Sequence, residues 1–209
     1  TGTTLGADNG IAVAFALALL DSKDLAHPAL EALVTSDEEM GMSGAQNFDP
    51  SLLSSKILIN IDTEEEGELY VSCAGGARGV FEIPVENISV EEKGFHLKVR
   101  GLQGGHSGAD IHLQRGNANK ILGRVLDKLN KETQITLGHI SGGSKDNAIP
   151  READAIFIAK DNEKTIKIIN EFQEVLKNEL RVSDSNINLQ FEEITVKSVF
   201  SEDTSSKII

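Results

Sequence analysis

The stretch QRGNANKILGRVLDKLN, residues 114–130, sets the pattern for the larger part of this 209-residue chain. Its apolar residues stand at positions 118, 121, 122, 125, 126 and 129, the spacing that places them on one face of an α-helix. A helix with one apolar face must bury that face against another layer of the fold. The stretch therefore predicts an amphipathic helix packed on a sheet.

Strands are expected on both sides of this helix, and a second helix is expected further along the chain. NEKTIKIINEFQEVLKNEL (162–180) repeats the helical spacing. The segments that read as strands are RGVFEIPVENI (78–88), GFHLKVRGL (94–102), QITLGHISG (134–142), AIPREADAIFIAK (148–160) and NINLQFEEI (186–194). Two strand–helix–strand units in succession predict a ferredoxin-like α+β domain over residues 76–209.

The first 75 residues have a different pattern, in which an apolar helix is followed by apolar strands. IAVAFALALLDS (11–22) is apolar nearly all round and predicts a buried helix, with Asp8 or Asn9 at its N-terminus. ALEALVTS (29–36) and KILINID (56–62) read as buried strands. We therefore expect a partial α/β domain over residues 1–75, and a boundary within the glycine-rich AGGAR.

Composition excludes some classes of protein. The net charge is −13, and the chain has no basic stretch that could neutralise nucleic-acid phosphates, which argues against a nucleic-acid-binding protein. No run approaches the ~20 apolar residues that a membrane-spanning helix needs. The single cysteine, Cys73, fits a reducing compartment, so we expect a cytoplasmic protein. The chain starts without Met and ends in turn residues, and we expect it to be an internal piece of a longer protein.

Acidic residues follow the apolar elements of the first 75 residues. Asp8 lies in LGADNG, Glu38 and Glu39 lie in TSDEEMG, and Asp62 ends the second strand in INIDTEEEG. Carboxylates that converge at one edge of a sheet repel each other unless a cation lies between them. However, an Asp ahead of a helix is more often an N-cap than a metal ligand, and acids also suit a first helical turn. The spacing alone favours a helix start and a metal site about equally.

Five motifs together carry a resemblance to a known family. They are GTTLGADNG, TSDEEMGMSGA, ILINIDTEEEGE, GLQGGHSGADIH and NAIPRE, in this order between residue 2 and about residue 180. The set resembles the aminoacyl-histidine (Xaa-His) dipeptidases of the M20 metallopeptidase family, which includes carnosinases and peptidase T. The resemblance implies a partial zinc-peptidase-like α/β catalytic domain followed by a ferredoxin-like lid and dimerisation domain. It also implies a zinc-dependent dipeptidase that hydrolyses Xaa-His dipeptides as a homodimer formed through its second domain.

The resemblance assigns the acidic residues to a centre of two divalent metal ions. Asp8 matches the carboxylate that bridges the two ions, and Glu39 and Asp62 match terminal ligands, one on each ion. Zn²⁺ is the expected metal, with Mn²⁺ or Co²⁺ as alternatives. Glu38 matches the general base, which takes a proton from the attacking water and delivers it to the leaving amine. Asp37 is left with a structural role.

Residues of the second domain are assigned in the same way. His106 in GGHSG matches a histidine that reaches an active site and stabilises the oxyanion, although a lone histidine between glycines also reads as a turn residue. Asn147 and Arg151 in NAIPRE match substrate-contacting positions.

The two histidine ligands of the family have no match in this chain. None of the five histidines is followed two residues later by Asp, as the first ligand of the family is. We therefore expect the 209-residue chain alone to have little or no peptidase activity. Two alternatives stay open: another M20-type peptidase or N-acyl amino acid hydrolase, and an isolated, non-catalytic lid and dimerisation module.

Overall fold

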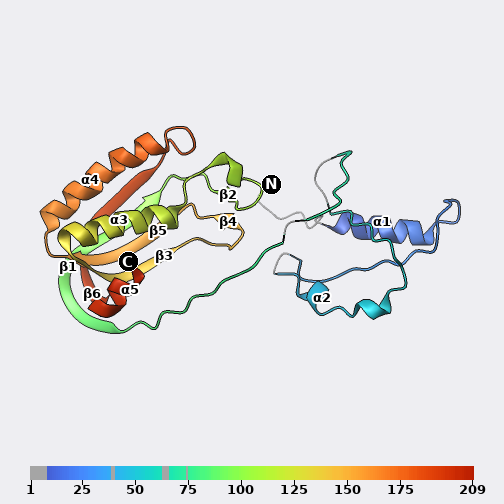
Figure 1. The fold of residues 1–209 in the computed structure, drawn as a ribbon, viewed down its shortest axis with the longest axis horizontal. Coiled ribbons are helices and arrows are strands. Elements are labelled where there is room, and N and C mark those ends of the chain that lie inside the picture. The colour runs from blue at the N-terminus through green and yellow to red at the C-terminus, as the bar shows by residue number, and fades with distance from the viewer. Residues whose placement is uncertain (1–8, 39–40, 63–65, 74) are drawn as a thin grey trace. The chain divides into compact units, whose positions relative to one another are not determined.

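The computed structural model describes residues 9–38, 41–62, 66–73 and 75–209 (Figure 1). The chain divides into two compact units, unit 1 over residues 1–77 and unit 2 over residues 78–209. Within the described ranges, no helix has the length and apolar character needed to cross a membrane.

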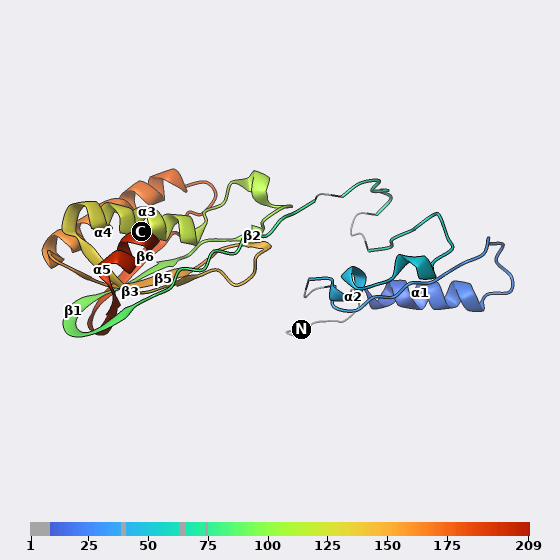
Figure 2. The ribbon, with the colours of Figure 1, turned by 60° about the horizontal axis from the view of Figure 1, so that its bottom comes forward.

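Unit 2 is built around a four-stranded antiparallel sheet. Its strands are β1 (Asn87–Arg100), β3 (Ile135–Gly142), β5 (Ala153–Ala159) and β6 (Asn188–Phe200), in the order β3-β5-β1-β6. Helix α3 (Ala118–Thr133) connects β1 to β3, and helix α4 (Asn162–Glu179) connects β5 to β6. Both helices lie on the same face of the sheet (Figure 2). The predicted α+β class of this domain and its two strand–helix–strand units are confirmed.

Shorter elements complete unit 2. Strand β2 (Gly105–His106) pairs with strand β4 (Ala148–Ile149) as a separate two-stranded sheet. The 3₁₀ helix η2 (Ile111–Leu113) follows β2, and helix α5 (Glu202–Ile208) follows β6.

The core of unit 2 lies between the sheet and its two helices. Phe95, Leu97 and Val99 alternate along β1 and are completely buried. The ring of Phe95 packs on the ring of Phe157 in β5, with centroids 5.7 Å apart. Helix α3 contributes the apolar face that its sequence predicts, namely Ala118, Ile121, Leu122, Val125, Leu126 and Leu129.

The strand expected at residues 78–88 forms only at its end, because β1 begins at Asn87. Pro84 has no backbone N–H to donate to a neighbouring strand. Pairing begins just after it, where the N–H of Ser201 donates to the carbonyl of Glu86 at 2.8 Å. Residues 87–100 then continue as one long strand beside β6.

Unit 1 contains helix α1 (Gly10–Asp21), helix α2 (Ser43–Gln46) and the 3₁₀ helix η1 (Pro50–Leu52). Asn9 caps α1, since its side-chain oxygen accepts from the N–H of Ala12 at 3.0 Å. The expected burial of this helix is wrong, because none of its residues is buried and Phe15 is 61% exposed.

The two strands expected in unit 1 do not form. Residues 29–36 and 56–62 form neither helix nor strand, and Leu58 is 78% exposed. A strand needs a neighbour that accepts its N–H groups and donates to its carbonyls. The described residues of unit 1 offer no such neighbour to either segment.

A carboxylate joins the first of these segments to the two residues just before the second. Both Glu31 oxygens accept hydrogen bonds from Ser54 and Ser55, including the backbone N–H of Ser55 at 2.7 Å and its hydroxyl. The hydroxyl of Ser55, then the N–H groups of Ser54 and Ser55, lower the pKa of Glu31 from 4.5 to about 2.

Titration of Glu31 tests this contact. A carboxyl whose pKa is lowered in the folded state stabilises the fold above its unfolded value and loses that contribution as the pH falls through the folded value. The stabilisation is therefore complete above about pH 4.5 and is lost as the pH falls through about 2. We expect the ¹³C signal of the Glu31 carboxyl to titrate near pH 2 and to move to higher pH in Ser55→Ala. A wild-type midpoint near 4.5 would contradict the contact.

Candidate active site

Asp37, the first residue of the acidic run, lies in a hydrogen-bonded turn ahead of α2. The carboxylate of Asp37 accepts from the hydroxyl of Ser43 at 2.6 Å, and its carbonyl accepts from the N–H of Met42 at 2.7 Å. Asp37 has a φ of 61°, a left-handed conformation that Asp tolerates better than most residues. The side chain of Asp37 therefore holds the turn, as expected from the sequence. Glu38, the next residue, is exposed.

Gly44, at the start of α2, lies against the backbone of Ser36. Its N–H donates to the carbonyl of Ser36 at 3.2 Å, so the start of α2 closes back on the residue before Asp37. A Cβ at position 44 would lie 2.6 Å from both the backbone N and O of Ser36. Only glycine permits this close approach.

Asp62 lies beside the start of α1. The side-chain amide of Asn9 donates to the carbonyl of Ile61 at 3.1 Å, and the N–H of Asp62 donates to Asn60 Oδ1 at 3.0 Å. The hydrogen bond between Asn9 and Ile61 links two segments that are far apart in the sequence. Each of these two residues is next in sequence to a predicted metal ligand. Asp8 and Glu39, the other two predicted ligands, fall outside the described residues.

The described part of the chain contains no group of three or more His, Cys, Asp or Glu side chains placed to hold a metal ion. Of the predicted ligands and base, it shows only Glu38 and Asp62, and both are exposed. The described residues of unit 1 therefore show carboxylates but no assembled metal centre.

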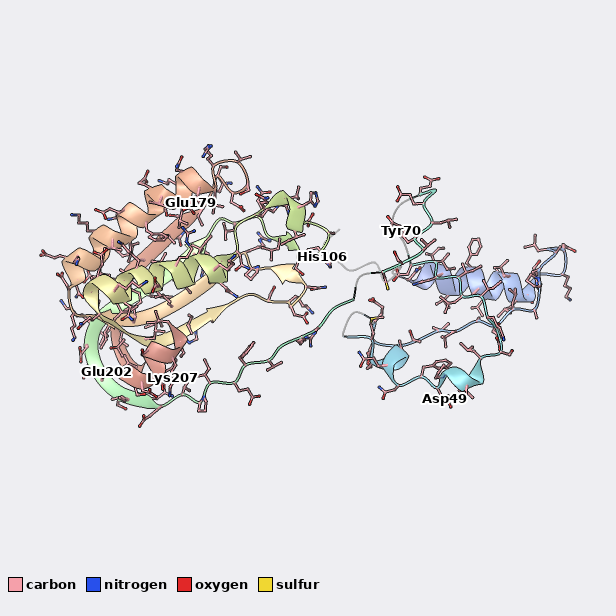
Figure 3. The ribbon with its side chains drawn as sticks, in the orientation of Figure 1. Asp49, Tyr70, His106, Glu179, Glu202 and Lys207 are labelled. Atoms are coloured by element: carbon pink, nitrogen blue, oxygen red, sulfur yellow. The ribbon has the colours of Figure 1, made fainter. Side chains whose placement is uncertain are left out.

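The three functional residues expected in unit 2 lie on neighbouring segments. His106 in β2 pairs with Ala148 in β4, and the N–H of Ser107 donates to the carbonyl of Asn147 at 2.8 Å. Arg151 follows β4, and its Nε donates to the carbonyl of Leu102 at 3.4 Å. The loop that carries His106 lies at the same end of unit 2 as β4 (Figures 1 and 3).

A cavity of about 560 Å³ opens between the loop that carries His106, the start of α3 and the segment that contains β4. Three cationic residues, Arg115, Lys120 and Lys145, contribute to its lining, against the single acid Asp146. A cavity with this balance of charge attracts anionic groups such as carboxylates. The sequence did not predict this cavity, because its cationic residues come from separate segments that do not form a basic run.

Asp184 is a second feature that the sequence did not predict. Its carboxylate accepts from the N–H of Gln103 at 2.8 Å and from the N–H of Gly116 at 2.7 Å. These residues stand at the two ends of the loop that carries His106, so one carboxylate that is only 1% exposed clamps both ends. In the sequence Asp184 sits in the polar stretch RVSDSN, where an Asp reads as an ordinary turn residue.

The opposite face of the sheet carries a separate group of charges. Asp154 accepts a bidentate pair of hydrogen bonds from the Arg100 guanidinium at 2.8 and 2.9 Å and lies 2.8 Å from His96 Nε2. Burial acts to raise the pKa of Asp154, but the hydrogen bonds from Arg100 and His96 outweigh it and hold that pKa below its ordinary value. The group joins strands β1 and β5 and is separate from the His106 loop.

Part of unit 2 matches a known protein family. Residues 97–184 match the family model described as a peptidase dimerisation domain. Unit 2 therefore contains an M20 peptidase dimerisation domain. The match takes in the later part of β1, the His106 loop, helices α3 and α4, and Asp184.

Two relatives extend the similarity beyond the dimerisation domain. The chain is 45% identical, over 197 residues and 92% of its length, to the cytosol non-specific dipeptidase of Escherichia coli (strain K12). It is 38% identical to the aminoacylhistidine dipeptidase of Vibrio alginolyticus, whose crystal structure matches 100% of this chain with a TM-score of 0.73. The chain spans 41% of the first protein and 44% of the second, so it is related to dipeptidases over nearly all of its own length and under half of theirs.

Substitution of Asp184 tests the clamp on the loop of this dimerisation domain. Asp184→Ala removes the acceptor of two N–H groups, and each buried group left unsatisfied costs about 1–3 kcal/mol. Asp184→Asn keeps one acceptor oxygen, and we expect a smaller loss. Urea unfolding measures both variants against Asp127→Ala, a partly exposed position on α3 where about 0.5 kcal/mol or less is expected. An Asp184→Ala protein as stable as the Asp127→Ala control would contradict the clamp.

Proposed function

We propose that this chain forms part of a cytoplasmic, metal-dependent dipeptidase that hydrolyses Xaa-His dipeptides and assembles as a homodimer through unit 2. The observation that carries the proposal is the 45% identity over 197 residues to a protein named as a dipeptidase. The aminoacylhistidine dipeptidase with a TM-score of 0.73 supports the preference for histidine, and the dimerisation-domain match supports the homodimer.

In this proposal Asp8, Glu39 and Asp62 hold two divalent cations, with Zn²⁺ preferred and Mn²⁺ or Co²⁺ as alternatives. Carboxylate oxygens bind all three ions, so the donor set fits such a centre. The contact between Asn9 and Ile61 supports the grouping, because Asp8 and Asp62 are the sequence neighbours of these two residues. The metal ions lower the pKa of water and polarise the scissile carbonyl when they are bound.

The remaining residues act on protons and on the substrate. Glu38 takes a proton from the attacking water and passes it to the leaving amine, which completes cleavage of the peptide bond. His106 donates a hydrogen bond to the carbonyl oxygen as that atom gains negative charge. Asn147 and Arg151 contact polar groups of the substrate. The exposed position of Glu38, beside a turn that Asp37 holds, is compatible with its role as a base.

A second candidate is a non-catalytic dimerisation module. The four-stranded sheet of unit 2, with its own buried core, favours it, since that part of the chain contains a recognised domain of this name. Another M20-type peptidase or an N-acyl amino acid hydrolase keeps the proposed chemistry and changes only the substrate.

A chimera tests the catalytic proposal. In it, this chain replaces the matching 197-residue region of the E. coli dipeptidase, and a panel of Xaa-His and other dipeptides is assayed. We expect turnover, and we expect Glu38→Gln to lower kcat by roughly 10²–10⁴-fold because it removes the general base. Bound metal, measured by atomic absorption, should stay the same. The 209-residue chain alone should show little or no hydrolysis.

Glu91→Gln is the matched control, since it makes the same change at an exposed position of β1. Loss of metal in Glu38→Gln would show that Glu38 is a ligand and that the roles of Glu38 and Glu39 are exchanged. Equal turnover by Glu38→Gln and Glu91→Gln would contradict a base at position 38. Hydrolysis of Xaa-His dipeptides by the chain alone would contradict the need for further ligands.

A further inference from the structure

The ring of His106 accepts two hydrogen bonds from its own loop. The backbone N–H groups of Gly108 and Ala109 lie 3.1 and 3.0 Å from His106 Nδ1. A backbone N–H can only donate, so Nδ1 must be the acceptor and carry no proton. In this arrangement a neutral ring holds its proton on Nε2, and a doubly protonated ring would set one N–H against two others.

The backbone of His106 also forms hydrogen bonds within the loop. Its N–H donates to Asp110 Oδ2 at 2.8 Å, and its carbonyl accepts from the N–H of Asp110 at 3.0 Å. The guanidinium of Arg115 lies 3.8 Å from the same Asp110 oxygen and donates to the carbonyl of Gly104 at 2.6 Å. Asp110 and Arg115 therefore fix the position from which the imidazole projects.

Gly105 makes room for this pair. A Cβ at position 105 would lie 2.6 Å from Arg115 Nη1 and 2.6 Å from Asp110 Oδ2, and its φ of +138° is rare for residues with a side chain. The glycine before His106 thus allows the Asp110–Arg115 pair to lie against β2. The buried carboxylate of Asp184 clamps the ends of the same loop at Gln103 and Gly116.

We propose that residues 103–116, the His106 loop, hold the neutral His106 imidazole in the tautomer that carries its proton on Nε2, and that Asp110 and Arg115 are positioning residues for it. The proposal rests on the proposed function, in which His106 donates to an oxyanion. The Nε2–H group of the exposed His106 is then the donor, and it is oriented before any substrate binds. Because the neutral ring is the donor, the hydrogen bond does not require a protonated histidine.

Imidazole ¹⁵N NMR of the wild-type 209-residue chain shows directly which ring nitrogen of His106 carries the proton. The spectrum is recorded at about pH 8, where an ordinary histidine is neutral. We expect Nδ1 of His106 at the shift of a fully unprotonated nitrogen and Nε2 at the shift of a fully protonated one. Shifts averaged between two tautomers, or a proton on Nδ1, would overturn the proposal.

Variants of Asp110 test the positioning role. Asp110→Ala should move the two ring nitrogens toward averaged shifts, whereas Asp110→Asn keeps an acceptor for the His106 N–H and should retain the single tautomer. Asp127→Ala, which removes a partly exposed carboxylate of α3 that pairs with Lys131, should leave the ring signals unchanged. Amide shifts of the buried strand residues Leu97 and Ala155 report whether each variant stays folded.

These measurements test the positioning role of Asp110 separately from the catalytic role of His106. Ring signals in Asp110→Ala that match wild type, with the fold intact, would overturn the positioning role. If Asp110→Ala does not fold, the wild-type spectrum still decides the tautomer, and Arg115→Lys, which keeps the charge, replaces it as the positioning variant. None of these readouts uses turnover, so a chimera whose kcat is insensitive to His106→Ala would refute the catalytic role of His106 and leave the tautomer measurement intact.

Discussion

The antiparallel pairing of β1 with β5 is the interaction on which the architecture of unit 2 depends. Val99 near the end of β1 pairs with Ala153 at the start of β5. The chain therefore leaves β1 and enters β5 at the same end of the sheet. The loop that follows β1 carries His106, and the loop that precedes β5 carries Asn147, so one register brings both residues together.

The sequence predicted the elements whose periodicity has a packing reason. Helix α3 has its apolar residues on one face because the sheet buries that face, and β1 alternates because only one of its faces meets the helices. The sequence could not reveal Asp184, because its partners lie 81 and 68 residues away and only the folded chain brings them together. The cavity and the hydrogen bonds to His106 Nδ1 depend on tertiary placement in the same way.

Unit 1 shows the opposite case, in which apolar content predicted more structure than the described residues form. Residues 29–36 and 56–62 have the composition of buried strands, yet composition does not supply the neighbour that a strand must pair with. Local interactions did follow the sequence. Asn9 caps α1, and Asp37 holds the turn beside Glu38, because these contacts join residues close along the chain.

Hydrogen exchange of the 209-residue chain tests most directly the central claim that unit 2 folds around its own sheet while residues 29–36 and 56–62 of unit 1 stay outside any sheet. Exchange reports the free energy of opening each backbone hydrogen bond. Paired amides in the centre of β1 and β5 should be the most protected, and residues 29–36 and 56–62 should exchange at rates close to those of an unstructured peptide. Strong protection of either segment, or rapid exchange throughout β1, would contradict the account.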